Sequence, residues 1–142
     1  MTRKSLRYLL HIASCVPGLY ATLAFCAARR VIVRGPSMMP TLLPADLLLF
    51  DRLAYLRDRP ATGDIVLVRH PVQAKLRLVK RLAGVPGDAA GDRTLLRGEY
   101  WVLGDNQAMS TDSREFGPVR RRDLLGRAWI RYWPADEWKV WP

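Results

Sequence analysis

Cysteine and histidine are both scarce in this sequence: its 142 residues include two of each. Cys15 and Cys26 lie in the most apolar part of the chain, which excludes the disulfide framework of a small secreted protein. With only His11 and His70 besides, the chain has no cluster of metal-ligand residues, and we expect neither a metal nor another cofactor. His70 is followed by a proline, and no carboxylate is placed to orient it, so it is a weak candidate for a catalytic base.

Acidic residues are also few, at 13 against 23 lysines and arginines, which gives a net charge of +10. Such a balance favours an anionic partner, either a nucleic acid or a membrane surface. The basic residues are scattered, and no helix-turn-helix, zinc-finger or RNA-binding motif accompanies them. We therefore expect no nucleic-acid partner and favour a solvated or membrane-facing basic surface.

One long uncharged stretch, residues 8–28, contrasts with this basic remainder. Its 21 residues would form a helix of about 30 Å, the thickness of the hydrocarbon core of a bilayer. We predict one transmembrane helix within an N-terminal anchor, residues 1–30. A cleaved signal peptide ending at Cys26-Ala27-Ala28 and a buried core helix are the alternatives. Basic residues flank the stretch on both sides, so charge alone does not set its orientation.

After Arg30 the pattern becomes that of β-strands, so we expect residues 31–142 to form one mainly β domain of twisted antiparallel sheets. Short apolar runs between turn residues predict about seven strands. These runs are 31–33, 47–50, 65–68, 75–82, 95–96, 100–103 and 127–133. We expect the runs on either side of Gly98 to pair as a hairpin, residues 89–92 to be a loop, and residues 121–125 to make a turn of helix.

A lysine lies where the alternation of the 75–82 strand predicts burial: Lys80 shares a strand face with Leu76 and Leu78. Burial lowers the pKa of a lysine and makes it usable as a general base near neutral pH. Ser37, in the stretch VRGPSMMPTL, is a candidate nucleophile without a neighbouring histidine, and neutral Lys80 could take its proton. The alternative is that Lys80 extends from a strand edge into solvent.

A second polar region follows the 100–103 strand. Residues 103–119 combine short hydroxyl side chains with opposite charges, so this loop could form a hydrogen-bonded floor and orient a lysine. Its polar members are Asp105, Asn106, Ser110, Asp112, Ser113 and Arg114.

Four segments, in this order and spacing, resemble the type I signal peptidases, a family of membrane-anchored serine endopeptidases. They are V-x-G-x-S-M-x-P-T-L at 33–42, G-D-I-V at 63–66, K-R-x-x-G-x-P-G-D at 80–88 and G-D-N-x-x-x-S-x-D-S-R-x-x-G-P-V at 104–119. The resemblance implies a signal-peptidase-like β core that removes N-terminal signal or leader peptides after small residues. It also implies a single-pass protein whose catalytic domain lies on the outer, non-cytoplasmic face, with precursor proteins and the lipid bilayer as partners.

By this resemblance, Ser37 is the nucleophile, Lys80 the general base and Ser110 the hydroxyl that orients Lys80. The charge pairs Arg81 with Asp105 and Arg114 with Asp112 would hold the active-site loop in place. The family binds its substrate as an extended strand over small pockets. By position, these pockets would be lined by Val31, Val33, Met38, Leu42, Leu78 and Val79.

The transition state of such a reaction needs hydrogen-bond donors for the oxyanion, and the backbone N–H of Ser37 is the natural one. Some family members add a serine hydroxyl two residues before the nucleophile. Here Gly35 occupies that position, so the chain follows the glycine branch of the family.

The short segment between Lys80 and Gly104 leaves no room for the large accessory domain of some bacterial members, so we expect a minimal catalytic core. Several functions fit such a core. One is a general signal peptidase. Another is a maturation protease dedicated to one precursor, such as nickel superoxide dismutase. A LexA-like autoprotease also uses a serine and a lysine, but lacks the apolar N-terminus. A non-catalytic membrane-anchored binding domain would not need Ser37, Lys80 and Ser110 together.

Four tryptophans crowd the C-terminus. We expect Trp138 and Trp141 to lie at the membrane interface, where tryptophan is enriched. Trp129 and Trp133 fit the core of the last strand equally well.

Overall fold

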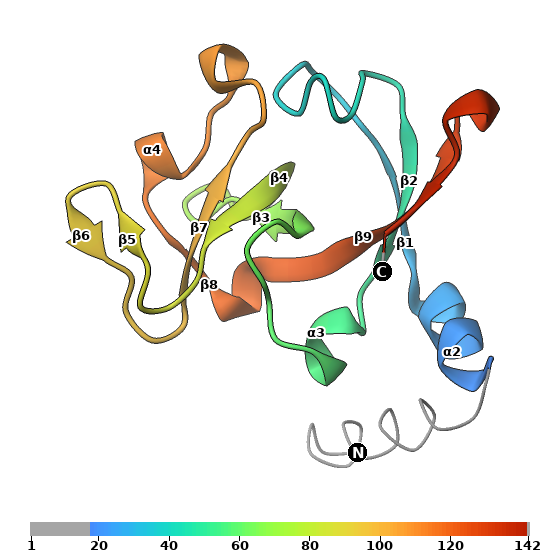
Figure 1. Cartoon of the computed structure of the whole chain (residues 1–142), viewed down its shortest axis with the longest axis horizontal. Coiled ribbons are helices and arrows are strands. Elements are labelled where there is room, and N and C mark those ends of the chain that lie inside the picture. The colour runs from blue at the N-terminus through green and yellow to red at the C-terminus, as the bar shows by residue number, and fades with distance from the viewer. Residues whose placement is uncertain (1–17, 142) are drawn as a thin grey trace.

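The computed structural model describes residues 18–141, and within them it confirms a mainly β, antiparallel fold (Figure 1). Eight strands form one sheet in the order β1-β2-β9-β3-β4-β7-β8 with β10 beside β9, and β5 pairs with β6 separately. The strands are β1 (Arg29–Ile32), β2 (Leu47–Asp51), β3 (Ile65–Arg69), β4 (Arg77–Gly84), β5 (Ala89–Ala90), β6 (Arg93–Thr94), β7 (Glu99–Leu103), β8 (Val119–Arg120), β9 (Leu124–Trp133) and β10 (Lys139–Val140). The helices are α2 (Leu19–Ala27), α3 (Ala54–Arg57) and α4 (Ser113–Phe116), with 3₁₀ turns η1 (Gln107–Met109), η2 (Arg121–Asp123) and η3 (Ala135–Glu137).

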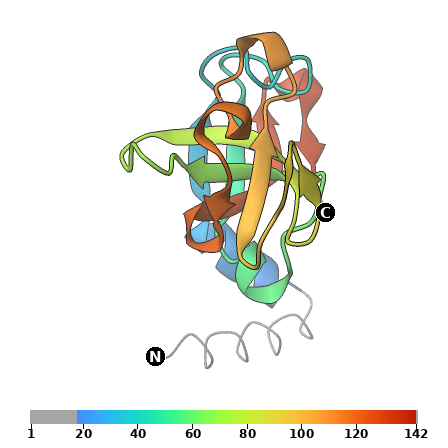
Figure 2. The same ribbon diagram turned by 90° about the vertical axis from the view of Figure 1, so that its left-hand side faces the viewer.

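β9 is the longest strand and lies between β2 and β3 (Figures 1 and 2). Its residues alternate between more and less buried positions, as expected for a strand whose two faces differ. On one side Ile130 is paired with Leu49, and on the other Arg127 is paired with Val66. β9 therefore joins the β1–β2 half of the sheet to the half that contains β3, β4, β7 and β8.

Hydrophobic side chains are buried on both faces of β3. Val66 and Val68 belong to a cluster that also contains Leu82 of β4, whereas Ile65 and Leu67 belong to a second cluster. Alternate residues of a strand point to opposite faces, so the two clusters lie on the two sides of the sheet. Each fully buried Val or Leu side chain stabilises the fold by about 1.5–3 kcal/mol. A continuous apolar run at 65–68 is thus explained by burial on both faces.

The hairpin expected around Gly98 is wrong. Residues 95–96 form no strand; β7 pairs instead with β4, placing Leu103 opposite Arg81 and Val102 opposite Leu82. This non-local pairing buries both Val102 and Leu82 completely. The segment 89–92, expected to be a loop, contains β5 and the turn that joins it to β6, and the expected turn of helix after Arg120 is the 3₁₀ turn η2.

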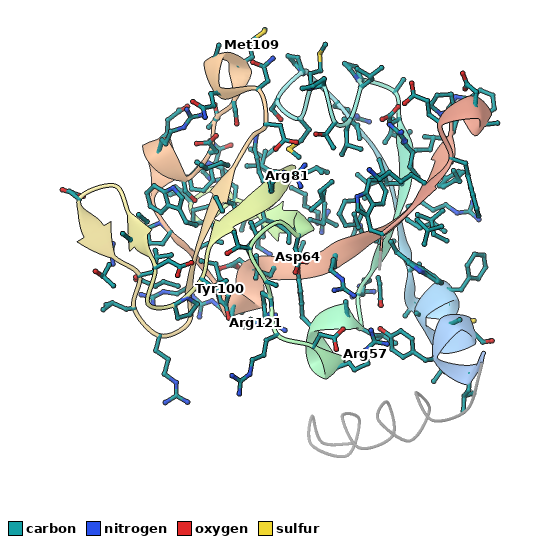
Figure 3. All side chains as sticks on the ribbon, viewed as in Figure 1. Arg57, Asp64, Arg81, Tyr100, Met109 and Arg121 are labelled. Carbon is teal, nitrogen blue, oxygen red and sulfur yellow. The ribbon has the colours of Figure 1, made fainter. Side chains whose placement is uncertain are left out.

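The anchor was predicted at residues 1–30, with the transmembrane helix in the uncharged stretch 8–28, and only the part from residue 18 onward, which includes the helix α2, falls within the described residues. Among residues 18–141, no helix is long and apolar enough to cross a membrane. α2 lies at the end of the molecule opposite the loops that follow β1 and β7 (Figures 1 and 2). The Tyr20 hydroxyl donates a hydrogen bond to Asp51, and the guanidinium of Arg57 lies 4.2 Å from the centre of the Tyr20 ring. Figure 3 shows Arg57 at this end and Met109 at the other.

The C-terminal tryptophans differ from the expectation in two places. Trp133 is 55% exposed and is therefore not a core residue, although it ends the long strand β9. Trp141 is partly buried against the cluster that contains Met38 and Phe50. Trp138 is 62% exposed, in agreement with the expected surface position.

Candidate active site

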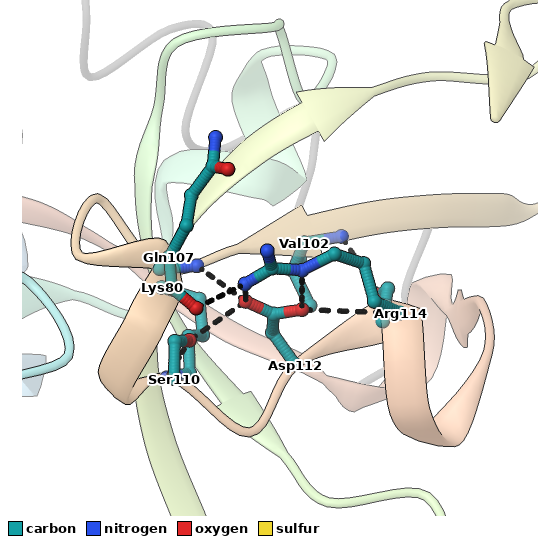
Figure 4. Close-up of polar contacts among 8 residues, drawn as sticks. Lys80, Val102, Gln107, Ser110, Asp112 and Arg114 are labelled. Atoms are coloured by element: carbon teal, nitrogen blue, oxygen red, sulfur yellow. Dashed lines mark hydrogen bonds and ion pairs between the residues drawn. The ribbon is translucent and has the colours of Figure 1, made fainter. Parts of the chain in front are cut away.

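Lys80 is buried in β4, with only 2% of its surface exposed, so it does not extend into solvent. Its Nζ donates a hydrogen bond of 2.9 Å to Ser110 Oγ (Figure 4). Burial lowers the pKa of Lys80, because the ammonium form loses its hydration; the charge of Asp112 acts in the opposite direction. The strand pattern therefore predicted the burial correctly, and the position favours a neutral amine.

Ser110 connects Lys80 to a fully buried carboxylate. Its hydroxyl donates to Asp112 Oδ2 at 2.7 Å while accepting from Lys80. Asp112 also accepts from the Gly104 N–H at 3.0 Å and from the Nε and NH2 groups of Arg114 at 2.9 and 2.8 Å. Burial alone would raise the pKa of Asp112, but these donors hold it well below its usual range. Asp112 is therefore a charged anchor for the Ser110 hydroxyl.

The same carboxylate shapes the loop around it. Asp112 caps the short helix α4 by accepting from the backbone N–H of Arg114, the role that aspartate commonly has at a helix N-terminus. Arg114 also donates to the carbonyl of Gln107 at 3.1 Å, which ties η1 to α4. The predicted pair of Asp112 with Arg114 is thus formed and fixes the backbone on both sides of Ser110.

The second predicted pair, Arg81 with Asp105, lies beside Lys80. Two hydrogen bonds of 2.8 and 2.7 Å join the guanidinium to the carboxylate. Burial would raise the pKa of Asp105, but the bonds from Arg81 outweigh it and lower that pKa. Arg81 also donates to the Gly63 carbonyl and to Thr41 Oγ1. One arginine therefore connects three loops around β4 (Figure 3).

Ser37 lies in the loop after β1, next to these groups. The N–H of Asn106 donates to the Ser37 carbonyl at 3.0 Å. A Cβ on Gly104 would lie 2.2 Å from Ser110 Oγ and 2.5 Å from the Ser37 carbonyl oxygen, so the two serines are neighbours across that glycine. Within residues 18–141, the Oγ and the backbone N–H of Ser37 have no hydrogen-bond partner. Both groups remain available to a ligand.

A pocket of about 110 Å³ opens beside Ser37 and Lys80. Two stretches of chain form its walls: residues 31–34 at the end of β1 and residues 77–80 at the start of β4. It is lined by Val31, Ile32, Val33, Arg34, Ser37, Met38, Arg77, Leu78, Val79 and Lys80. Leu42, the remaining residue expected there, is fully buried in the same core cluster as Met38.

Three lining residues were not expected: Ile32, Arg34 and Arg77. Alternation along a strand predicts that every second residue lines a pocket on one face of the sheet. This pocket lies along strand edges and is therefore lined by consecutive residues. Gly104 was also missed as a site residue, although its place at the start of the G-D-N segment was the available signal.

His70 is held in a turn rather than in the pocket. Its Nδ1 accepts from the N–H groups of Val72 and Gln73 at 3.2 and 3.0 Å, and its ring packs 4.8 Å from that of Phe116. The described residues also contain no group of three His, Cys, Asp or Glu side chains placed to hold a metal ion. Among the residues that line the pocket, Ser37 has a hydroxyl and Lys80 an amine.

Comparison with known proteins shows the family to which the chain belongs. The family described as "Signal peptidase, peptidase S26" matches residues 5–91 and 89–133. The chain is 39% identical over 117 residues to the mitochondrial ATP-independent inner membrane protease subunit 1a of Arabidopsis thaliana, covering 73% of this chain and 70% of that protein. It is 35% identical over 131 residues to the mitochondrial inner membrane protease subunit 1 of Xenopus tropicalis, covering 82% and 78%. It is 31% identical over 147 residues to the signal peptidase I of Leptolyngbya laminosa, covering 79% and 71%. The chain therefore belongs to the signal peptidase family, peptidase S26, and is a serine endopeptidase.

Proposed function

We propose that this enzyme removes N-terminal signal or leader peptides with Ser37 as nucleophile and Lys80 as general base. The observation that carries this proposal is the buried Lys80 amine, held by Ser110 beside the loop of Ser37. Lys80 and Ser37 also line one pocket. A lysine is otherwise almost never buried without a charged partner, so its position calls for a chemical reason.

The proposed reaction uses the lysine twice. Neutral Lys80 takes the proton of Ser37 Oγ as the oxygen attacks the scissile carbonyl, and the ammonium then protonates the departing amine. Water hydrolyses the acyl-enzyme with the same lysine as base, and Ser37 regains its proton. The free N–H of Ser37 is the proposed donor to the oxyanion, a contribution of about 3 kcal/mol. Ser110, fixed by Asp112, keeps the amine in position throughout.

The walls of the pocket suit an extended peptide. Among the described strands, β1 pairs only with β2 and is an edge of the sheet, while β4 pairs with β7 only from Arg81 onward. Residues 31–34 and 77–80 therefore offer unpaired backbone groups to a strand lying between them. The small volume of the pocket favours residues such as alanine in the substrate. This is how we expect Val31, Val33, Met38, Leu78 and Val79 to contribute to specificity.

We also propose that residues 1–30 anchor the enzyme in a membrane in a single pass, with the catalytic domain, residues 31–142, on the non-cytoplasmic face. Names of relatives support membrane association, since two of those compared above are inner membrane proteases. The uncharged stretch of the sequence supports the anchor.

Trp133 and Trp138 should contact the bilayer, because both are exposed near the C-terminus. All five tryptophans lie between residues 101 and 141, so tryptophan fluorescence reports on this domain alone. In vesicles of brominated lipid, the full chain should show quenching that Trp133→Ser with Trp138→Ser largely removes. Trp101→Phe, in β7, should keep it. Equal quenching in the double variant would contradict this contact.

The function is tested by offering the detergent-purified enzyme a panel of precursors with Ala-x-Ala cleavage sites. We expect cleavage of at least one precursor by the unchanged enzyme and by Thr94→Ala, an exposed residue of β6 in the separate β5–β6 hairpin. Ser37→Ala should cleave none, because it has no nucleophile. If no precursor is cut in a Ser37-dependent way, the general role is wrong.

A second candidate function is maturation of a single precursor, such as nickel superoxide dismutase. It would use the same catalytic residues. The observation that favours a narrower substrate range is the positive charge of Arg34 and Arg77 at the mouth of the pocket. Selective cleavage of one precursor from the panel would support it.

A further inference from the structure

Two arginines stand at the mouth of the pocket. Arg34 follows β1 and Arg77 begins β4; both are exposed, and both line the pocket with Ser37 and Lys80. Within the described part of the chain, neither side chain makes a hydrogen bond or an ion pair. Arg81 and Arg114, by contrast, are each bound to an aspartate. The charges of Arg34 and Arg77 are thus unused by the fold.

The surroundings add to this positive charge. In the β3–β4 ladder, Arg77 lies directly opposite Arg69, which is also exposed. Like charges in that position destabilise a pair of strands. No acidic residue lines the pocket, and the carboxylates of the neighbouring loop, Asp105 and Asp112, are neutralised by their own arginines. A carboxylate entering the pocket mouth would therefore meet unpaired guanidinium groups.

We propose that Arg34 and Arg77 recognise an aspartate or glutamate of the precursor beside the bond that is cut. This inference rests on the proposed function and narrows its substrates to leader peptides with an acidic residue near the cleavage site. A guanidinium binds a carboxylate through two parallel, charge-assisted hydrogen bonds. Residues 31–34 and 77–80 face the same extended peptide, so an arginine from either wall reaches it.

A peptide suits these residues better than a lipid headgroup does. Both arginines share their pocket with Ser37, where a precursor must lie during cleavage. Binding a carboxylate there would also hold the precursor in register relative to the serine. Phosphate headgroups remain a measurable alternative.

The test uses the full chain in neutral detergent and peptides that differ only by Asp or Asn at one position. That position is moved residue by residue across the cut bond. At one position at least, kcat/KM should be about tenfold higher for the Asp peptide. Arg34→Gln with Arg77→Gln should remove this preference, so that the ratio of kcat/KM for the Asp peptide to that for the Asn peptide falls to about one. Arg97→Gln, an exposed arginine between β6 and β7, should keep it.

The outcomes separate this inference from the function on which it rests. Equal rates for Asp and Asn peptides at every position would overturn the inference and leave the peptidase intact. No Ser37-dependent cleavage of any peptide would contradict the proposed function, and the inference with it. If the double variant loses activity only in vesicles containing phosphatidylglycerol, equally for both peptides, the arginines bind lipid and the inference is wrong. If Arg77→Glu cleaves a peptide with Lys at that position faster than the peptide with Asp, the inference is supported further.

Discussion

Replacing Lys80 with methionine should lower kcat by at least about 10³-fold, because among residues 18–141 no other side chain is placed to act as the base. His70 is engaged in a turn, and Asp112 is held as an anion by Arg114. Lys80→Arg should be equally inactive, since a guanidinium does not give up its proton. The measurement is single-turnover cleavage of a precursor by each variant.

The stability of Lys80→Met distinguishes loss of the base from misfolding. Folding lowers the pKa of Lys80 below its usual 10.5, so the folded chain binds a proton less readily than the unfolded chain. This destabilisation is complete below the folded-state pKa and disappears as the pH rises towards 10.5. At neutral pH Lys80→Met should therefore unfold at an equal or higher temperature than the unchanged enzyme.

The cleavage rate should rise as the amine of Lys80 loses its proton. Cleavage by the unchanged enzyme should increase as the pH rises through the lowered pKa of Lys80, because the neutral amine is the base. A Lys80→Met protein of reduced stability, or a kcat within tenfold of the original, would contradict the assignment of Lys80.

Gly104→Ala should reduce kcat by about 100-fold, through displacement rather than loss of a reacting group. Its Cβ would fall 2.2 Å from Ser110 Oγ and 2.5 Å from the Ser37 carbonyl oxygen. Neither neighbour is free to move, since Ser110 is held by Lys80 and Asp112, and the Ser37 carbonyl is bound by Asn106. Overpacking of this kind also costs about 1–3 kcal/mol of stability. The measurements are kcat and the free energy of unfolding.

Gly126→Ala is the matched control. Its Cβ would lie 2.8 Å from the Asp51 carbonyl oxygen, in β9 and outside the pocket. We expect a similar loss of stability with unchanged kcat for the folded protein. Full activity in Gly104→Ala, or equal losses of kcat in both variants, would show that the close contact at Gly104 does not position the serines.

Much of the fold follows from local sequence, and the errors occur where the partners are distant. The apolar runs at 47–50, 65–68 and 127–133 correctly predicted strands, because each is short and bounded by turn residues. The predicted partner of β7 was wrong. Local turn residues suggested a hairpin with residues 95–96, whereas pairing with β4 buries Val102. The buried pair of Arg131 with Asp46 has no local signal at all, because the two residues are 85 positions apart.

The site was more predictable than the strand pairing. Alternation placed Lys80 on a buried face, and the polar composition of residues 103–119 indicated a hydrogen-bonded loop, which the contacts of Ser110 and Asp112 confirm. The roles of Ser37 and Lys80 stay predictions derived from the family. Arg34, Arg77 and Gly104 could not be found by periodicity, because a strand edge and a close backbone contact are products of the assembled structure.

The position of β9 has a consequence for the timing of activity during synthesis. Ser37 follows β1 and Lys80 lies in β4, and among the strands that the structure describes only β9 joins their two halves of the sheet. β9, Leu124–Trp133, is synthesised after both Ser37 and Lys80. A growing chain therefore carries both residues long before it can bring them together. We therefore expect the nascent chain to have no peptidase activity until β9 has been synthesised.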